Sequence, residues 1–246
     1  MPANRMSRSA DDNDGTVKQR SGWLIPIAVF VVTAGLSAII LLFYLAPTPT
    51  SFIEEHAAPT SRTDKVALSV NGLKFDVPAN YIKFASARQG GPRKEVALFT
   101  TFPDFEGYSD SNASDFSDNA ADSPVIFLLL REEQYKISEA DRLQRVYMSY
   151  ITNPAGKPGP FGLTQYVFRD DSGYHGEDLF VGQDDGKPVV LRCVRFSAQV
   201  PSPSCLRDIR LGHDVALSYR FKRAQLGHWA DIIHGVDKLI ASFTVK

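Results

Sequence analysis

The sequence lacks the short motifs that mark the common catalytic and nucleotide-binding sites. It has no Walker A motif, no GxGxxG, no HExxH and no GxSxG around a serine. It also lacks an excess of charge of either sign, since 27 basic residues stand against 28 acidic ones. Because nucleic acid binding needs a basic surface, this balance argues against a nucleic acid partner. The sequence therefore indicates no enzyme class and no cofactor.

Charged residues are also missing from one long run. Residues 23–46, WLIPIAVFVVTAGLSAIILLFYLA, carry no charge. An uncharged apolar run of this length predicts a transmembrane helix, with the lipid bilayer as its partner. A cleaved signal peptide is the alternative, but its apolar core is only roughly 7–15 residues long. Basic residues before the run and acidic ones after it place the N-terminus in the cytoplasm and the C-terminal part in the periplasm, at a bacterial inner membrane. These residues are Arg5, Arg8, Lys18 and Arg20, then Glu54 and Glu55.

Composition divides the rest of the chain. Residues 1–22 have too few apolar side chains for a core and are expected to form a disordered cytoplasmic tail. Residues 47–65, rich in Pro, Thr and Ala, have the composition of a spacer. Residues 66–246 have the length and apolar content of one globular domain, which the topology above makes periplasmic.

Cysteine is scarce, and Cys193 and Cys205 form the single possible pair. In an oxidising compartment such a pair favours a structural disulfide. A redox pair and a zinc site completed by His213 with another histidine are the alternatives. Neither CxxC nor paired metal-ligand spacing is present, so no metal site is predicted.

The domain shows strand patterns along most of its length. Asn71-Gly72 lies between two alternating runs, which predicts a hairpin. The run VIFLLL at 125–130 is apolar throughout and predicts a central strand. Other strands are expected at 94–102, 163–168, 177–182, 189–197 and 215–222.

Two helices interrupt these strands. Ser138 is placed to cap a helix that ends at Asn153-Pro154, and residues 223–242 have apolar side chains at helical spacing. Strands and helices do not alternate regularly. We therefore expect an α+β domain with a largely antiparallel sheet of about seven strands and two packed helices, with an α/β/α sandwich as one arrangement, preceded by the transmembrane helix.

Three polar regions are candidate sites. The acidic stretch 104–122 is rich in oxygen ligands that could bind calcium. It lacks EF-hand spacing, however, and has the composition of a solvated loop. His175 and Glu177 lie within one turn and have the chemistry for acid-base catalysis, or they mark a tight hairpin between strands. The final third is basic, and strand alternation puts several arginines on one sheet face, either to bind an anionic group or as an ordinary solvated surface. The residues singled out for ligand binding are Arg192, Arg195, Arg220, His175 and Glu177.

The segments PDFEGYS, GPFGLTQYVF, GYHGEDL, LRC with CLRDI, and SYRFKRAQLGHW resemble a family of single-pass, membrane-anchored proteins of proteobacteria. This resemblance implies an inner-membrane setting and assigns no activity. The segments NGLKFDVPANYI and LIASFTV are similar to the ends of PsbP-like periplasmic α/β/α sandwich domains. That second resemblance implies a sheet with helices packed on it.

Three functions fit these observations. The leading one is a non-catalytic periplasmic interaction domain, with an envelope protein or a second copy of the chain as partner. The alternative is a domain that binds a small ligand or lipid, which needs an apolar cavity between sheet and helices. The third is a hydrolase-like enzyme that uses the region of His175 and Glu177.

Overall fold

The computed structural model describes residues 22–45, 57–133, 137–212 and 214–245. The chain separates into two compact units, residues 1–54 and 55–246, which are described one at a time. Residues 1–21 of the predicted tail and 47–56 of the predicted spacer lie outside the described residues, as does His213.

The first unit contributes one helix, α1, Leu24–Leu45. No helix in the described part of the chain is long and apolar enough to cross a membrane. The prediction of a transmembrane helix over residues 23–46 is therefore not supported.

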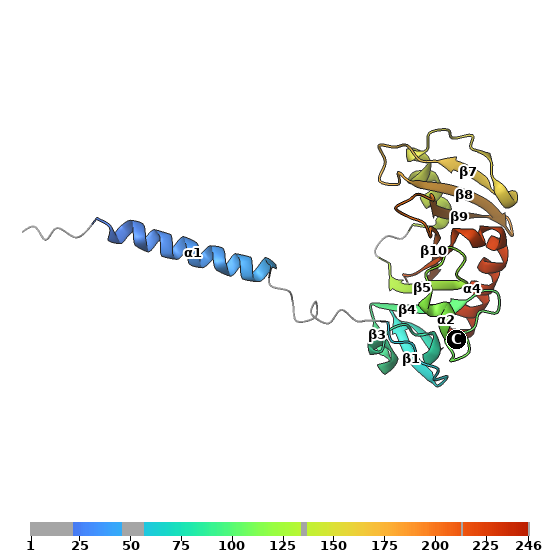
Figure 1. Ribbon diagram of the computed structural model, residues 1–246, viewed down its shortest axis with the longest axis horizontal. Coiled ribbons are helices and arrows are strands. Elements are labelled where there is room, and N and C mark those ends of the chain that lie inside the picture. Colours follow the sequence, from blue (N-terminus) through green and yellow to red (C-terminus); the bar gives the residue numbers. More distant parts are fainter. Residues whose placement is uncertain (1–21, 46–56, 134–136, 213, 246) are drawn as a thin grey trace, which may run out of the picture. The chain divides into compact units, whose positions relative to one another are not determined.

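The second unit is built on an eight-stranded sheet whose neighbouring strands are all antiparallel. Its order is β4-β5-β11-β10-β9-β8-β7-β6, and Figure 1 shows most of these strands stacked in that sequence. The strands are β4 (Glu95–Thr101), β5 (Val125–Glu132), β6 (Lys157–Pro158), β7 (Thr164–Val167), β8 (Glu177–Asp184), β9 (Lys187–Val194), β10 (Ser204–Gly212) and β11 (Val215–Lys222).

A second, three-stranded sheet has the order β2-β1-β3. The predicted hairpin joins β1 (Lys65–Val70) to β2 (Leu73–Pro78), and its turn residues Asn71 and Gly72 have φ of 44° and 84°. Positive φ at both positions suits Asn-Gly and matches the twist of the strands. The third strand, β3 (Gly91–Arg93), runs parallel to β1.

Short helices fill the connections, and one longer helix ends the chain. Ser138 caps α3 as the sequence predicts, because its hydroxyl accepts the Asp141 N–H at 3.0 Å. The predicted helix at 223–242 is a 3₁₀ segment followed by α4. The α-helices of this unit are α2 (Ala113–Ser117), α3 (Glu139–Arg145) and α4 (Trp229–Phe243), and the 3₁₀ segments are η1 (Ala79–Tyr81), η2 (Ser86–Gln89), η3 (Tyr147–Tyr150), η4 (Pro160–Gly162) and η5 (Arg223–His228).

The fold expected from the sequence was wrong in two respects. In place of one sheet of about seven strands, the described residues form two sheets, of three and eight strands. In place of two helices after α1, they form three α-helices, so that the described α-helices number four with α1. The physical reason is that β3 and β6 span only three and two residues, too few to show an alternating pattern. Strand β10 was not predicted either, because its side chains are mostly charged or small and do not alternate.

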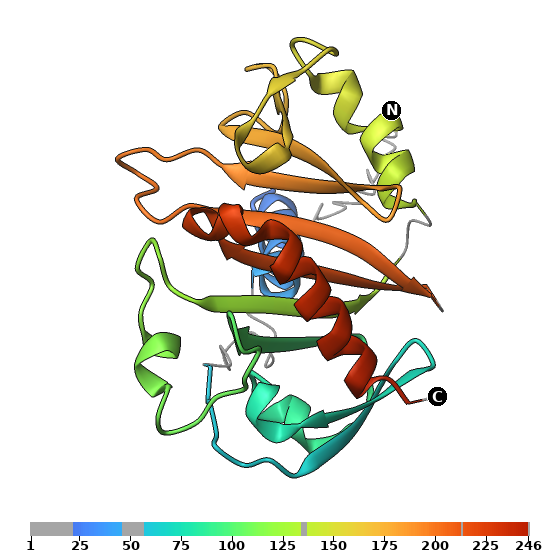
Figure 2. The same cartoon turned by 90° about the vertical axis from the view of Figure 1, so that its right-hand side faces the viewer.

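Helices cover both faces of the large sheet, but not evenly. Figure 2 shows α4 crossing the strands on one face, where Ile232, Val236 and Ile240 are buried against the main core together with the three-stranded sheet. On the opposite face, called the outer face below, α3 and η3 pack over β8 and β9 through Leu143 and Tyr147.

Within the large sheet, the long strands β9 and β10 pair over a short stretch only. Strands β8 and β9 pair over eight residues, whereas β9 and β10 pair only at Cys193–Cys205 and Arg192–Leu206. The two cysteines face each other there and form the predicted disulfide, which is fully buried. The prediction of a structural disulfide is confirmed, and the bond joins the two halves of the sheet.

The disulfide should contribute substantially to stability, because it closes a loop with a sequence separation of 12. We expect the double variant Cys193→Ala/Cys205→Ala to lose about 2–4 kcal/mol of unfolding free energy, measured by urea denaturation. Reductant should lower the midpoint of the unaltered protein comparably and leave the double variant unchanged. An equal effect of reductant on both proteins would contradict this role.

Candidate binding face

The outer face carries a row of side chains that runs across the large sheet. Strand pairing aligns Phe99, Phe127, Arg220, Leu206 and Arg192 from β4 to β9. The next row contains Ala97, Leu129, Ser218 and Asp208. Phe99 is covered by Phe116 of α2, with ring centroids 4.6 Å apart, and Arg192 is covered by η3, but the middle of the row is open.

This open part forms a hollow of about 330 Å³, here called the Phe127 groove. It lies on an uncovered sheet face, not between sheet and helices as the ligand-binding alternative requires. The Phe127 ring is 40% exposed, more than nearly all other large apolar side chains of the domain. Its lining residues are Lys83, Ala97, Leu98, Phe127, Leu128, Leu129, Leu206, Ser218, Tyr219 and Arg220.

Two cations of the groove have no carboxylate partner. Lys83 Nζ lies 5.1 Å from the centroid of the Phe127 ring, a cation-π contact, and Arg220 is exposed directly across the strand pair from Phe127. Neither side chain forms an ion pair within the described ranges. The groove therefore combines an apolar floor with unmatched positive charge.

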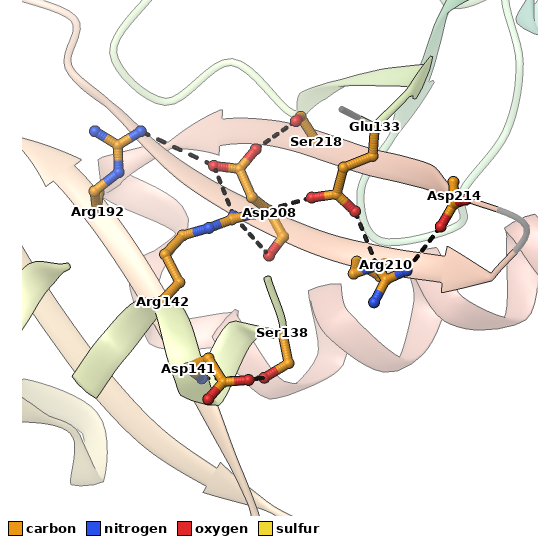
Figure 3. A network of polar contacts seen from close by, with 9 residues as sticks. All are labelled: Glu133, Ser138, Asp141, Arg142, Arg192, Asp208, Arg210, Asp214 and Ser218. Carbon is orange, nitrogen blue, oxygen red and sulfur yellow. Dashed lines mark hydrogen bonds and ion pairs between the residues drawn. The ribbon is translucent and has the colours of Figure 1, made fainter. Parts of the chain in front are cut away.

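Charges near α3 on the outer face are matched. Figure 3 shows Asp208 of β10 accepting a short hydrogen bond from Ser218 while Arg142 of α3 approaches it, with 3.6 Å between Nη1 and Oδ2. Glu133 lies between Arg142, at 3.4 Å, and Arg210, at 3.0 Å. Because each arginine of this network faces a carboxylate, the network links α3 to the sheet and offers no free acid or base.

A single carboxylate closes the gap where β9 and β10 part. Glu139, the first residue of α3, accepts the backbone N–H of Val190 at 2.8 Å and holds the Arg207 guanidinium through two contacts of 2.9 Å. Arg207 also donates to the Tyr219 hydroxyl at 3.1 Å. Burial raises the pKa of Tyr219, and although burial alone would lower the pKa of Arg207, the Glu139 carboxylate raises it. Both side chains are therefore held in their ordinary protonation states, and the buried polar groups at the gap are satisfied.

Two of the ligand-binding residues predicted from the sequence meet each other. Arg192 Nη1 lies 2.9 Å from Glu177 Oε2, and its guanidinium stacks near the rings of Tyr147 and Tyr174, 5.7 Å and 5.2 Å from their centroids. The same arginine reaches toward Asp208 at 4.0 Å. Arg192 is thus engaged within the protein, and Glu177 with it.

Arg195 belongs to a second cluster, at the N-terminal end of β8. Its Nε donates to Asp178 at 2.9 Å, and Arg223 donates to the other oxygen of the same carboxylate at 2.7 Å. Burial alone would raise the pKa of Asp178, but the hydrogen bonds from Arg223 and Arg195 outweigh it and hold the pKa below its usual range. Asp178 is therefore a buried anion that stabilises this end of the strand.

The region of His175 shows no catalytic arrangement among the described residues. His175 is exposed, and its Nδ1 lies 3.3 Å from the Ser172 carbonyl oxygen in a tight turn. The neighbouring Glu177 is occupied by Arg192. A general base needs a partner that orients it and a reachable substrate proton, and neither is seen here. Across the described part of the chain, no three His, Cys, Asp or Glu side chains converge as a metal site requires.

The acidic stretch 104–122 is attached to the sheet by a lysine. Lys222 at the end of β11 is 6% exposed, and its Nζ donates to Asn119 and to Ser202 at 2.6 Å each. Burial lowers the pKa of Lys222. The stretch is thereby joined to the β9–β10 loop at one edge of the domain.

Arg220 is the one predicted ligand-binding residue that the structure leaves unpaired among those it describes. Its groove partners Phe127, Lys83 and Leu206 were missed. The run VIFLLL did not indicate that Phe127 is exposed. A strand buried on both faces and a strand with a single exposed apolar residue can have the same sequence pattern. The alternation of β11, which puts Ser218 and Arg220 on one face, was the one useful signal.

No family model matches the chain, and no curated protein matches it. A solved structure, that of Smlt3025, described as an immunity protein of the Stenotrophomonas maltophilia type IV secretion system, has the same fold with a TM-score of 0.53. The two sequences are 18% identical, and the match covers 75% of this chain and 94% of that one. The resemblances to membrane-anchored proteobacterial proteins and to PsbP-like domains stay predictions.

Glu139 should be critical for the junction between the sheet halves. We expect Glu139→Ala to lose about 3–4 kcal/mol of unfolding free energy, because it leaves Arg207 buried without a counterion and the Val190 N–H without an acceptor. Hydrogen exchange at the Val190 amide should accelerate as well. Glu95→Ala, at an exposed position of β4, serves as control and should change stability by less than about 0.5 kcal/mol. Unchanged exchange at Val190 would contradict the proposed bridge.

The Asp178 cluster should make stability depend on pH. Because the folded pKa lies below the unfolded one, its contribution is fully present above about pH 4 and is lost as the pH falls through the folded value. We expect Asp178→Asn to cost about 2 kcal/mol at pH 7 in urea denaturation, with a smaller difference at pH 3. Asp171→Asn, at an exposed ion pair, is the control and should show almost no difference at either pH. A difference for Asp178→Asn that is as large at pH 3 as at pH 7 would exclude this role.

Proposed function

We propose that the second unit, residues 55–246, acts as a non-catalytic protein-binding module of the immunity type, which protects a cell by forming a complex with a toxic protein. The observation that carries this proposal is the fold shared with an immunity protein over 94% of that protein's length. The bound partner would be a protein, and the chain itself would need no cofactor.

The arrangement of charged side chains supports a binding role over catalysis. Glu133, Glu139, Asp178 and Asp208 are each held by arginines, so their carboxylates are committed to the fold. An enzyme ordinarily keeps at least one acid or base free to meet a substrate. Protein interfaces, by contrast, are enriched in aromatic residues, and this sheet face presents a partly exposed one.

We further propose that the module works outside the cytoplasm, in an oxidising compartment such as the periplasm. The buried Cys193–Cys205 disulfide supports this, because such bonds persist where thiols are not kept reduced. Blocking free thiols in intact cells before lysis tests it, since the two cysteines should resist alkylation. Full alkylation of both would contradict this placement.

The binding role is tested with the full-length chain produced in its native cells. After crosslinking, the recovered partner is identified, produced alone in a reporter strain and then produced together with this chain. We expect the partner to arrest growth, this chain to restore it, and the purified pair to bind with a Kd of about 10 nM or below, as toxin–immunity pairs bind tightly. A recovered partner that leaves growth unaffected, or an arrest that this chain does not relieve, would reject the immunity role.

A further inference from the structure

We infer that the Phe127 groove is the docking surface of the module, and that it receives an acidic surface of the partner protein with an apolar side chain at its centre. This inference rests on the proposed protein-binding function. It names the part of the domain that makes the contact and the chemistry of what it contacts.

The floor of the groove is apolar and built on the sheet. Phe127 and Leu129 of β5 point outward beside Leu206 of β10, and all three are at least partly exposed. Strands fix these side chains on a rigid surface, so little conformational freedom is lost when a partner covers them. Aromatic residues and arginine are both enriched at protein interfaces.

The charge of the groove specifies the partner. Arg142, Arg192, Arg207 and Arg210 all face carboxylates of this chain. Lys83 and Arg220 differ, since no carboxylate lies within 4 Å of either in the described part of the chain. They stand on either side of the Phe127 ring, one through a cation-π contact and the other across the strand pair. A complementary surface places Asp or Glu side chains around an apolar residue that contacts Phe127.

A membrane surface fits the groove less well than a protein does. Recognition of anionic lipid headgroups ordinarily takes a cluster of roughly 4–8 Lys or Arg side chains. The groove has two unmatched cations, and Arg131, which is exposed on the same face of β5 beyond Leu129, adds only one more. The hollow of about 330 Å³ has room for one or two apolar side chains of a partner, not for an extended lipid surface.

The direct test uses a labelled synthetic peptide of alternating Glu and Leu, with fluorescence anisotropy on the full-length chain. A second peptide with Lys in place of every Glu serves as the charge control. We expect the acidic peptide to bind and the basic one not to bind. The variants Phe127→Ala, Lys83→Glu and Arg220→Glu should each raise the Kd for the acidic peptide about tenfold. Added salt should raise this Kd as well.

Matched variants on other surfaces separate this groove from unspecific attraction. Phe196→Ala removes an aromatic ring that is 72% exposed in the β9–β10 loop, and Lys238→Glu reverses an exposed charge on α4, across the sheet from the groove. Both should bind the peptide like the unaltered protein. Equal binding of both peptides, no saturable binding, or equal losses in the groove and control variants would overturn the inference. Binding to phosphatidylglycerol vesicles that is lost in Lys83→Glu and Arg220→Glu would also overturn it, in favour of lipid.

The growth-arresting partner, assayed against the groove variants, separates the two proposals. If that partner binds the groove variants as tightly as the unaltered chain, the groove is not the docking surface and the immunity role stands. If no partner arrests growth but the acidic peptide binds the groove as expected, the immunity role fails and the docking surface stands.

Discussion

The contact between β9 and β10 is the constraint on which the rest of the second unit depends. Two residue pairs, one of them the disulfide, are all the strand pairing that joins the halves of the eight-stranded sheet. Beyond them the strands part, and their backbone groups would be left without partners, which is costly inside a protein. Glu139 occupies this gap by accepting the Val190 N–H and pairing with Arg207. A covalent bond and one carboxylate therefore keep the sheet continuous.

The same junction explains how the outer face is divided. Because Glu139 begins α3, filling the gap also places α3 and η3 over β8 and β9, where Leu143 and Tyr147 are buried. Among the described residues, α2 covers one end of the other half of the face, from β4 to β10, through the contact of Phe116 with Phe99. Phe127 and Arg220 stay open as a result. The position of one helix thus separates the arginines that stabilise the fold from Arg220, which forms no ion pair in the described part of the chain.

Local features of the fold were predictable, and non-local ones were not. Asn71-Gly72, the Ser138 cap and the apolar spacing of the terminal helix each depend on neighbours within a few residues, and each was found in the structure. β10 was missed because Arg207, a charged residue, occupies a position that alternation assigns to the buried side. Only its pairing with Glu139, 68 residues earlier in the chain, makes that burial tolerable. The helix at residues 23–46 was read from composition, and the expected membrane crossing is not supported by the described residues.

By itself, the sequence determined the hairpin, the amphipathic final helix and a disulfide between the two cysteines, because turn chemistry, helical spacing and cysteine count act locally or leave no choice of partner. Tertiary structure alone decided that Arg192 and Arg195 are bound to Glu177 and Asp178 while Arg220 is free of any carboxylate in the described residues. The physical reason is that an arginine's role depends on what lies opposite it across the sheet. That neighbour is set by strand order and register, which depend on contacts between residues far apart in the chain.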